Sequence, residues 1–141
     1  MFELVKNLYG GAEVTPPGDN FSFEASGAIS EGAVCTATTN GTVVAASDDT
    51  SEAYIVAVEE AEEAGDDVRG MYILPGMVFR APKNDDAHSG AYIGNNSMEM
   101  DENGTEAKID QDPSAASGAL TLLNYDDDFA YVTFNKGALF K

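Results

Sequence analysis

The sequence has few of the residues on which catalytic and metal sites are usually built. Its 141 residues include one cysteine, one histidine and no tryptophan. A single cysteine, Cys35, excludes an intrachain disulfide and a thiolate metal cluster, and it leaves the redox compartment undetermined. A Ser-His-Asp or Cys-His arrangement would have to use His88, which lies in a polar stretch with no nucleophile motif nearby. We therefore expect Cys35 to be structural and His88 to be a solvated loop residue.

Basic residues are also scarce. Seven Lys and Arg stand against 25 Asp and Glu, which gives a formal net charge of −18 at pH 7. Nucleic-acid binding draws its affinity from cations that neutralise phosphates, so this balance argues against DNA, RNA and anionic membranes as direct partners. No run reaches the ~18 apolar residues of a membrane helix, and the N-terminus lacks the apolar core of a signal peptide. We expect a soluble protein made in the cytoplasm.

What the sequence does contain is a series of short, strand-like runs separated by turns. Asn40-Gly41 and Asn103-Gly104 lie between such runs and predict hairpins, because both residue types tolerate the positive φ of a type I′ turn. Pro75-Gly76 predicts a turn between two strands. The acidic residues 126–128 predict a tight turn between the last two strands. The acidic stretch 59–67 is too short and too self-repelling for a stable helix, and it predicts another turn.

About eight to ten short strands with no long helical pattern are typical of an all-β fold, a small antiparallel β-barrel or sandwich. The first twenty residues differ from this pattern. They carry several apolar side chains and then Gly10-Gly11 and Pro16-Pro17-Gly18, which cannot continue a regular element. We expect an extended N-terminal arm at residues 1–20 and a barrel-like domain at residues 21–141.

The many carboxylates allow two further hypotheses. A hydrolase with a carboxylate pair needs one buried acid with a raised pKa, whereas these acids concentrate at hydrated turns. Calcium is a better candidate, because hard cations take oxygen ligands from acidic turns such as 101–103 and 126–128. In the loop that begins at Asp101, however, Gly104 is at the fourth position, whereas an EF-hand loop has its glycine at the sixth. Charged turns that keep edge strands soluble are the simpler interpretation. We predict no cofactor and no metal, and we keep a calcium-dependent surface β-sandwich binding module as the alternative function.

The order of motifs from Ile29 to Phe79 resembles a known family. The motifs are Ile29–Val34, Asn40–Ala46, Tyr54–Val58, Ala61–Val68 and Pro75–Phe79. This progression is similar to that of the head-decoration, or capsid-cementing, proteins of tailed bacteriophages, with weaker support from Tyr131–Phe134. The resemblance implies a non-enzymatic virion protein on the outer surface of the mature capsid, assembled in the host cytoplasm. It also implies that the partner is the major capsid protein and that the protein is a homo-oligomer, most often a trimer.

The apolar residues near both chain ends are the candidate capsid or oligomer contacts. In the arm these are Phe2, Leu4, Val5, Leu8 and Tyr9. An arm of this kind can add a strand to the sheet of a capsid subunit, with main-chain hydrogen bonds supplying affinity. The alternative is that these residues fold back and fill the core of their own domain. Leu139 and Phe140 follow Gly137 beyond the last expected strand and are a candidate oligomer contact.

Overall fold

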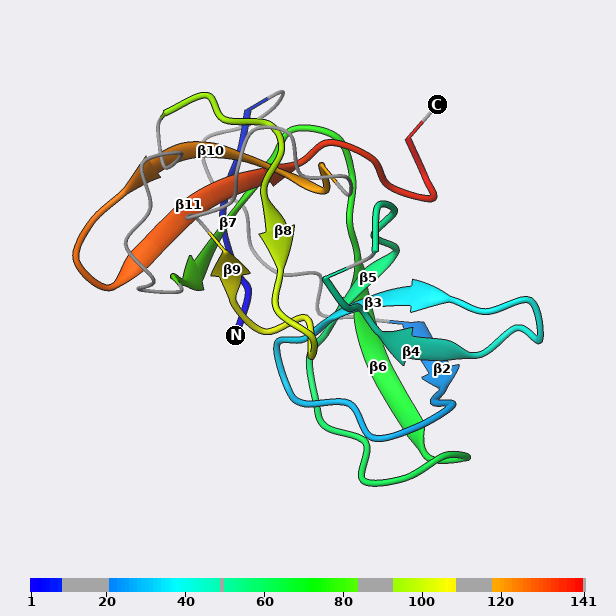
Figure 1. The fold of residues 1–141 in the computed structure, drawn as a ribbon. Helices are drawn as coiled ribbons and strands as arrows, with labels where there is room; N and C mark the ends of the chain where they lie inside the picture. Colours follow the sequence, from blue (N-terminus) through cyan, green and yellow to red (C-terminus); the bar gives the residue numbers. More distant parts are fainter. Residues whose placement is uncertain (9–20, 49, 84–92, 109–117, 141) are drawn as a thin grey trace.

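The protein folds into two packed β-sheets and a small third sheet (Figure 1). The computed structural model describes residues 1–8, 21–48, 50–83, 93–108 and 118–140. In these residues there are eleven strands and no helix, and every pair of neighbouring strands is antiparallel. None of the described residues forms a helix with the length and hydropathy needed to cross a membrane. The predicted all-β fold class is confirmed.

The four-stranded sheet has the order β1-β7-β11-β10, and the five-stranded sheet has the order β2-β6-β5-β3-β4. The strands of the first are β1 (Glu3–Asn7), β7 (Met77–Pro82), β10 (Leu120–Tyr125) and β11 (Phe129–Phe134). Those of the second are β2 (Phe21–Glu24), β3 (Val34–Ala37), β4 (Val43–Ala45), β5 (Ile55–Ala57) and β6 (Asp67–Tyr72). The third sheet pairs β8 (Glu99–Met100) with β9 (Ala107–Lys108).

The five-stranded sheet curls into a small barrel. The chain after β2 meets the far edge strand β4 through a parallel bridge between Ala25 and Val43. The N–H of Ser26 also donates to the carbonyl of Val43 at 2.9 Å. A sheet that closes in this way leaves few unpaired edges. Its interior is a cluster of mostly small buried side chains: Ala25, Ile29, Ala33, Cys35, Val43, Ile55, Ala57, Ala61 and Val68.

A larger core lies between the two main sheets. Its aromatic centre is Phe79, whose ring meets that of Phe134 edge-on with centroids 5.4 Å apart. Met98 and Met100 enter this core from the β8 segment, and both are fully buried. Figure 1 shows β8 and β9 between the two larger sheets. The β8–β9 hairpin therefore fills the junction between the two larger sheets.

Each predicted hairpin is present. Asn40-Gly41 connects β3 to β4, Asn103-Gly104 lies between β8 and β9, and residues 126–128 connect β10 to β11. Gly41 and Gly104 have φ of +81° and +69°, the region that glycine adopts without steric cost. Neither Asn40 nor Asn103 has a positive φ, so the predicted type I′ geometry was wrong although the hairpins are present. The turn at Pro75-Gly76 has a different role, because β6 and β7 belong to different sheets. That turn carries the chain from the barrel into the four-stranded sheet.

The first eight residues are part of the folded domain. Glu3–Asn7 forms β1, which pairs with β7. Phe2 is 2% exposed, and its ring centroid lies 5.8 Å from that of Phe134. The alternative in which N-terminal apolar residues fill the protein's own core therefore applies to Phe2. The boundary expected at residue 20 lies outside the described residues.

Candidate partner-binding surfaces

Residues from the two ends of the chain meet at one hollow of about 330 Å³. Leu8, at the end of β1, and Phe140 line it together with Pro75, Gly76, Thr133, Phe134 and Asn135. None of these lining residues is acidic. Leu74 and Leu139, which adjoin Pro75 and Phe140 in the chain, are exposed large hydrophobic residues. We call Leu8, Leu74, Pro75, Leu139 and Phe140 the apolar end.

The C-terminal part of the apolar end is held in place by backbone contacts. The N–H of Ala138 donates to the carbonyl of Ala53 at 2.9 Å, and that of Phe140 donates to the carbonyl of Gly137 at 3.0 Å. The Phe140 ring packs so closely on Gly137 that a Cβ there would lie 2.5 Å from its Cε1 atom. Residues 137–140 therefore form a turn in which Leu139 is exposed and Phe140 is partly buried against the main core.

The remaining predicted contact residues lie elsewhere. Phe2 and Leu4 line a second hollow between β1 and the five-stranded sheet. Val5 lines a third, with Tyr131 and Leu123, on the outer face of the four-stranded sheet. Tyr9 and His88 lie outside the described residues. The structure thus brings Leu8 and Phe140 to one hollow, whereas Phe2, Leu4 and Val5 line the other two.

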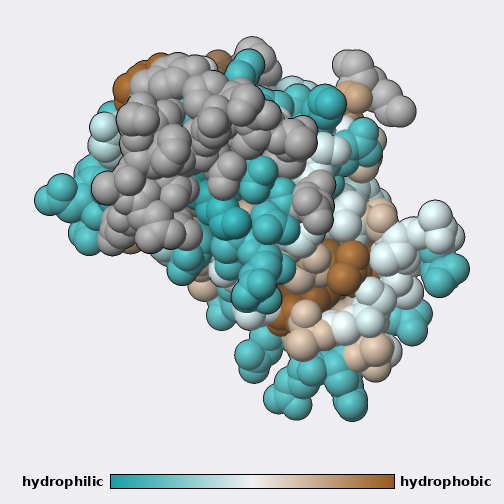
Figure 2. Space-filling model, in the orientation of Figure 1, coloured by the Kyte–Doolittle hydropathy of each residue, from teal (hydrophilic) through white to brown (hydrophobic). Residues whose placement is uncertain are grey.

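An aromatic cluster on the five-stranded sheet was not predicted from the sequence. It consists of Phe21, Phe23, Tyr54 and Tyr72, whose neighbouring ring centroids are 5.2 to 5.9 Å apart. Phe21 is 61% exposed. Burial, followed by the hydrogen bond with Tyr72, raises the pKa of Tyr54. In Figure 2, hydrophobic residues bordered by polar ones lie at the surface of the part of the molecule where Figure 1 places the five-stranded sheet.

A sequence signal for the aromatic cluster existed only in part. Phe21 and Phe23 alternate around Ser22, and this spacing places both rings on one face of a strand. Nothing local links them to Tyr72. The pairing of β2 with β6 and of β6 with β5 brings these rings and that of Tyr54 together.

The outer face of the four-stranded sheet is tied together by one arginine. Arg80 of β7 forms an ion pair with Glu3 of β1, and this contact raises the pKa of the guanidinium. The guanidinium carbon also lies 4.5 Å from the centroid of the Phe129 ring, a cation–π contact. These contacts link β1 to β7 and β11. They therefore position the first strand.

The acidic turns use their carboxylates to hold the backbone. Asp66, Asp101 and Asp126 each accept two backbone N–H groups at 2.6 to 3.1 Å. The N–H groups of Asp128 and then Phe129 hold the pKa of the Asp126 carboxyl below its ordinary value. Among the described residues, no group of three or more His, Cys, Asp and Glu side chains is placed to hold a metal ion. The calcium module stays a prediction.

Cys35 lies inside the small barrel, and burial raises its pKa from 9.0 to about 12. This rise lowers the thiolate population at pH 8 by roughly a thousandfold, and the thiolate is the reactive form. We expect a disulfide reagent such as Ellman's reagent to label the native protein at least a hundredfold more slowly than the protein in urea. The absorbance of the released thiol measures both rates. Equal rates in buffer and in urea would contradict the buried position.

No family model matches the chain, and no curated protein matches it. The surfaces described above are therefore interpreted from their own chemistry.

Proposed function

We propose that the protein is a non-enzymatic structural protein of a phage virion, which binds the outer surface of the mature capsid and cements neighbouring major capsid subunits. The observation that carries this proposal is the apolar end. The hollow at the apolar end is lined by no acidic residue, although the chain contains 25 Asp and Glu. Depletion of charge around exposed apolar and aromatic residues is the composition of the centre of a protein–protein interface.

The sequence resemblance supports the same proposal. The motifs that resemble those of capsid-cementing proteins run from Ile29 to Phe79 and cover β3 to β7. They therefore include most of the small barrel and the turn at Pro75-Gly76, which contributes to the apolar end. The all-β fold agrees with the barrel that the resemblance implies.

If the protein cements the capsid, it does so by mass action. A protein that binds only the mature lattice stabilises that lattice by RT ln(1 + [L]/Kd). If it is a trimer, each contact raises the effective concentration of the remaining ones. The net charge of −18 keeps the protein away from nucleic acid, and a protein outside the shell has no need to approach the packaged genome.

The substitution Leu8→Asp tests the proposal at the apolar end. We expect it to weaken binding to mature phage heads, stripped of accessory proteins, by at least tenfold, because it places a charge in the apolar contact. Cosedimentation with the heads measures the affinity. Ile93→Asp is the matched control, since Ile93 is 55% exposed and Leu8 is 53% exposed. Ile93 does not line the hollow at the apolar end, so this control should bind as the original protein does.

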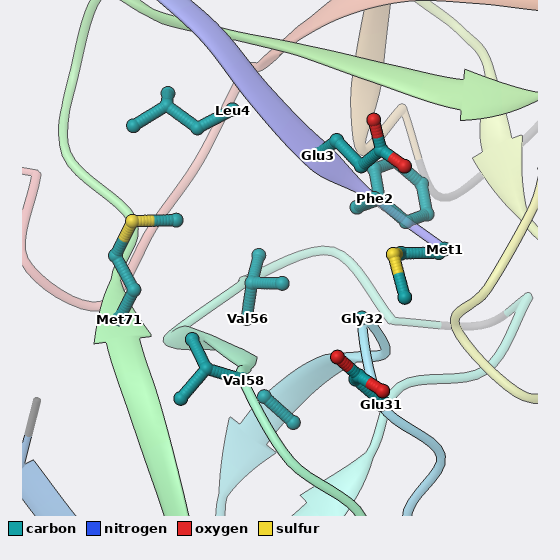
Figure 3. A pocket seen from close by; sticks show the side chains of 10 residues that line it. Met1, Phe2, Glu3, Leu4, Glu31, Gly32, Val56, Val58 and Met71 are labelled. Atoms are coloured by element: carbon teal, nitrogen blue, oxygen red, sulfur yellow. The ribbon is translucent and has the colours of Figure 1, made fainter. Parts of the chain in front are cut away.

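A point substitution is preferable to deleting residues 1–20. That deletion would remove β1 and the buried Phe2 (Figure 3), so lost binding would also follow from unfolding. Equal binding by the Leu8 and Ile93 variants would contradict the role of the apolar end. Failure of the intact protein to bind any mature head would overturn the proposal. The calcium-dependent module would then be tested by whether the thermal midpoint rises with Ca²⁺ and falls with a chelator.

A further inference from the structure

Two turns that share an Asn-Gly pair differ in how the rest of the fold holds them. Asn40 and Asn103 are both exposed, and each precedes a glycine of positive φ. In each turn the N–H of that glycine donates to the carbonyl three residues earlier, at 3.2 Å in both cases. The carbonyls are those of Thr38 and Asp101. Because the pair and its local hydrogen bond are the same, a large difference in reactivity has to come from tertiary contacts.

An Asn-Gly pair can react within itself. The backbone nitrogen of the glycine attacks the side-chain Cγ of the asparagine, and the new N–C bond closes a succinimide ring. The side-chain nitrogen leaves as ammonia and takes up the proton that the glycine nitrogen gives up. Water then opens the ring at either carbonyl, which gives aspartate or isoaspartate. Glycine favours the attack because it has no Cβ to hinder its nitrogen, and the reaction needs no reactant other than water.

The turn has to open before the ring can form. The attacking nitrogen must lose a proton that it donates to a carbonyl in the folded protein, so this hydrogen bond breaks first. Local opening of this kind has a free energy that varies widely within one protein. The rate of deamidation at each asparagine therefore follows the cost of opening its own turn.

The turn at Asn40 is held only by its own hairpin. Gly41 is exposed, and no atom lies within 4 Å of where its Cβ would be. The hydrogen bonds of this turn join Thr38 to Asn40, Gly41 and Thr42, all within the turn itself. Figure 1 shows the turn at the tip of the β3–β4 hairpin, where it projects from the molecule. Opening it therefore breaks no contact with another part of the fold.

The turn at Asn103 is docked on the small barrel. Gly104 is buried, and its carbonyl accepts the N–H of Val34 of β3 at 2.8 Å. The Cβ position of Gly104 lies 2.6 Å from the Val34 carbonyl oxygen, so the two backbones are in close contact. The Asp101 carboxylate also accepts the N–H groups of Thr105 and Glu106, at 2.6 and 2.9 Å. Opening this turn breaks contacts between two sheets.

We propose that Asn40 is a site of spontaneous deamidation and isoaspartate formation in the folded protein, and that docking of Gly104 on β3 protects Asn103 from the same reaction. Either product adds one negative charge at the tip of the β3–β4 hairpin. Isoaspartate also lengthens the main chain of the turn by one carbon atom. The inference is independent of the proposed function, because Asn40 lies outside the apolar end.

Ageing of the purified full chain in mildly alkaline buffer tests the inference. Peptide mapping with mass spectrometry separates asparagine, aspartate and isoaspartate at both positions. We expect Asn40 to be lost at least tenfold faster than Asn103 in the folded protein. In urea the two rates should become similar, because both turns are then open. Circular dichroism of the aged sample verifies that the protein stays folded.

A substitution and an exchange measurement test the mechanism separately. Gly41→Ala should slow the loss of Asn40 at least tenfold, because its Cβ hinders the attacking nitrogen, and should leave Asn103 unchanged. Amide hydrogen exchange should be at least tenfold faster at Gly41 than at Gly104. Equal loss of the two asparagines in the folded protein, or faster loss of Asn103, would overturn the inference. So would an Asn40 that persists in the folded protein while it reacts in urea.

Discussion

Replacing Phe2 with alanine is expected to destabilise the protein by about 3 to 5 kcal/mol, the range for a fully buried phenylalanine. Phe2 is 2% exposed and belongs to the main core, where its ring packs on that of Phe134. The loss would be a large fraction of the stability of a domain of this size, typically about 5 to 15 kcal/mol. Urea unfolding followed by far-UV circular dichroism measures the change in the free energy of unfolding.

The control for this prediction is Val5→Ala in the same strand. Val5 is 41% exposed, so its truncation should change the free energy of unfolding by no more than about 0.5 kcal/mol. If Phe2→Ala costs less than about 1 kcal/mol, β1 is not docked on the core as described. The N-terminal segment would then act as the free arm that the sequence suggested.

Gly104→Ala is expected to have the second large effect, a loss of about 3 kcal/mol in the free energy of unfolding. Gly104 has φ of +69°, a conformation that costs an alanine about 1 to 2 kcal/mol. A Cβ there would also lie 2.6 Å from the carbonyl oxygen of Val34 and 3.3 Å from backbone atoms of Ala46. These are backbone atoms and cannot move aside as a flexible side chain can. The clash would strain the hydrogen bond from the Val34 N–H to the Gly104 carbonyl, now 2.8 Å.

Gly41→Ala separates the two contributions to this effect. Gly41 also has positive φ, +81°, but no atom lies within 4 Å of where its Cβ would be. Gly41→Ala should therefore lower the free energy of unfolding only by the conformational cost of a positive φ, about 1 to 2 kcal/mol. Thermal and urea unfolding of the two variants give the difference. Equal costs would show that the β8–β9 hairpin does not dock against β3 through Gly104.

The two glycines also show how far local sequence reasoning extends. Both follow an asparagine, and both hairpins were predicted because Asn-Gly favours a turn with positive φ. The preference lies within two adjacent residues, so no tertiary information was needed. The contact of Gly104 with Val34 and Ala46 has no such local signal, because it depends on how one hairpin packs on another sheet.

The candidate surfaces divide in the same way. Leu8 and Phe140 were predicted as contacts because each is an apolar residue near a chain end, and they do line one hollow. Phe2 carried the same sequence signal and is instead buried in the core. Hydrophobicity predicts that a side chain will leave water, but it does not specify whether the chain's own core or a partner will cover it.

By itself the sequence determined an acidic, all-β chain with a single cysteine, and it determined the positions of the hairpin turns, since these depend on composition and on neighbouring residues. Only the tertiary structure decided that the turn at Pro75-Gly76 passes between two sheets, that β1 is an edge strand beside an apolar hollow, and that Phe21, Phe23, Tyr54 and Tyr72 form one aromatic cluster. These features arise from pairing between strands distant in the chain. Such pairing is set by the fit of whole surfaces in the core, and short sequence motifs do not encode that fit.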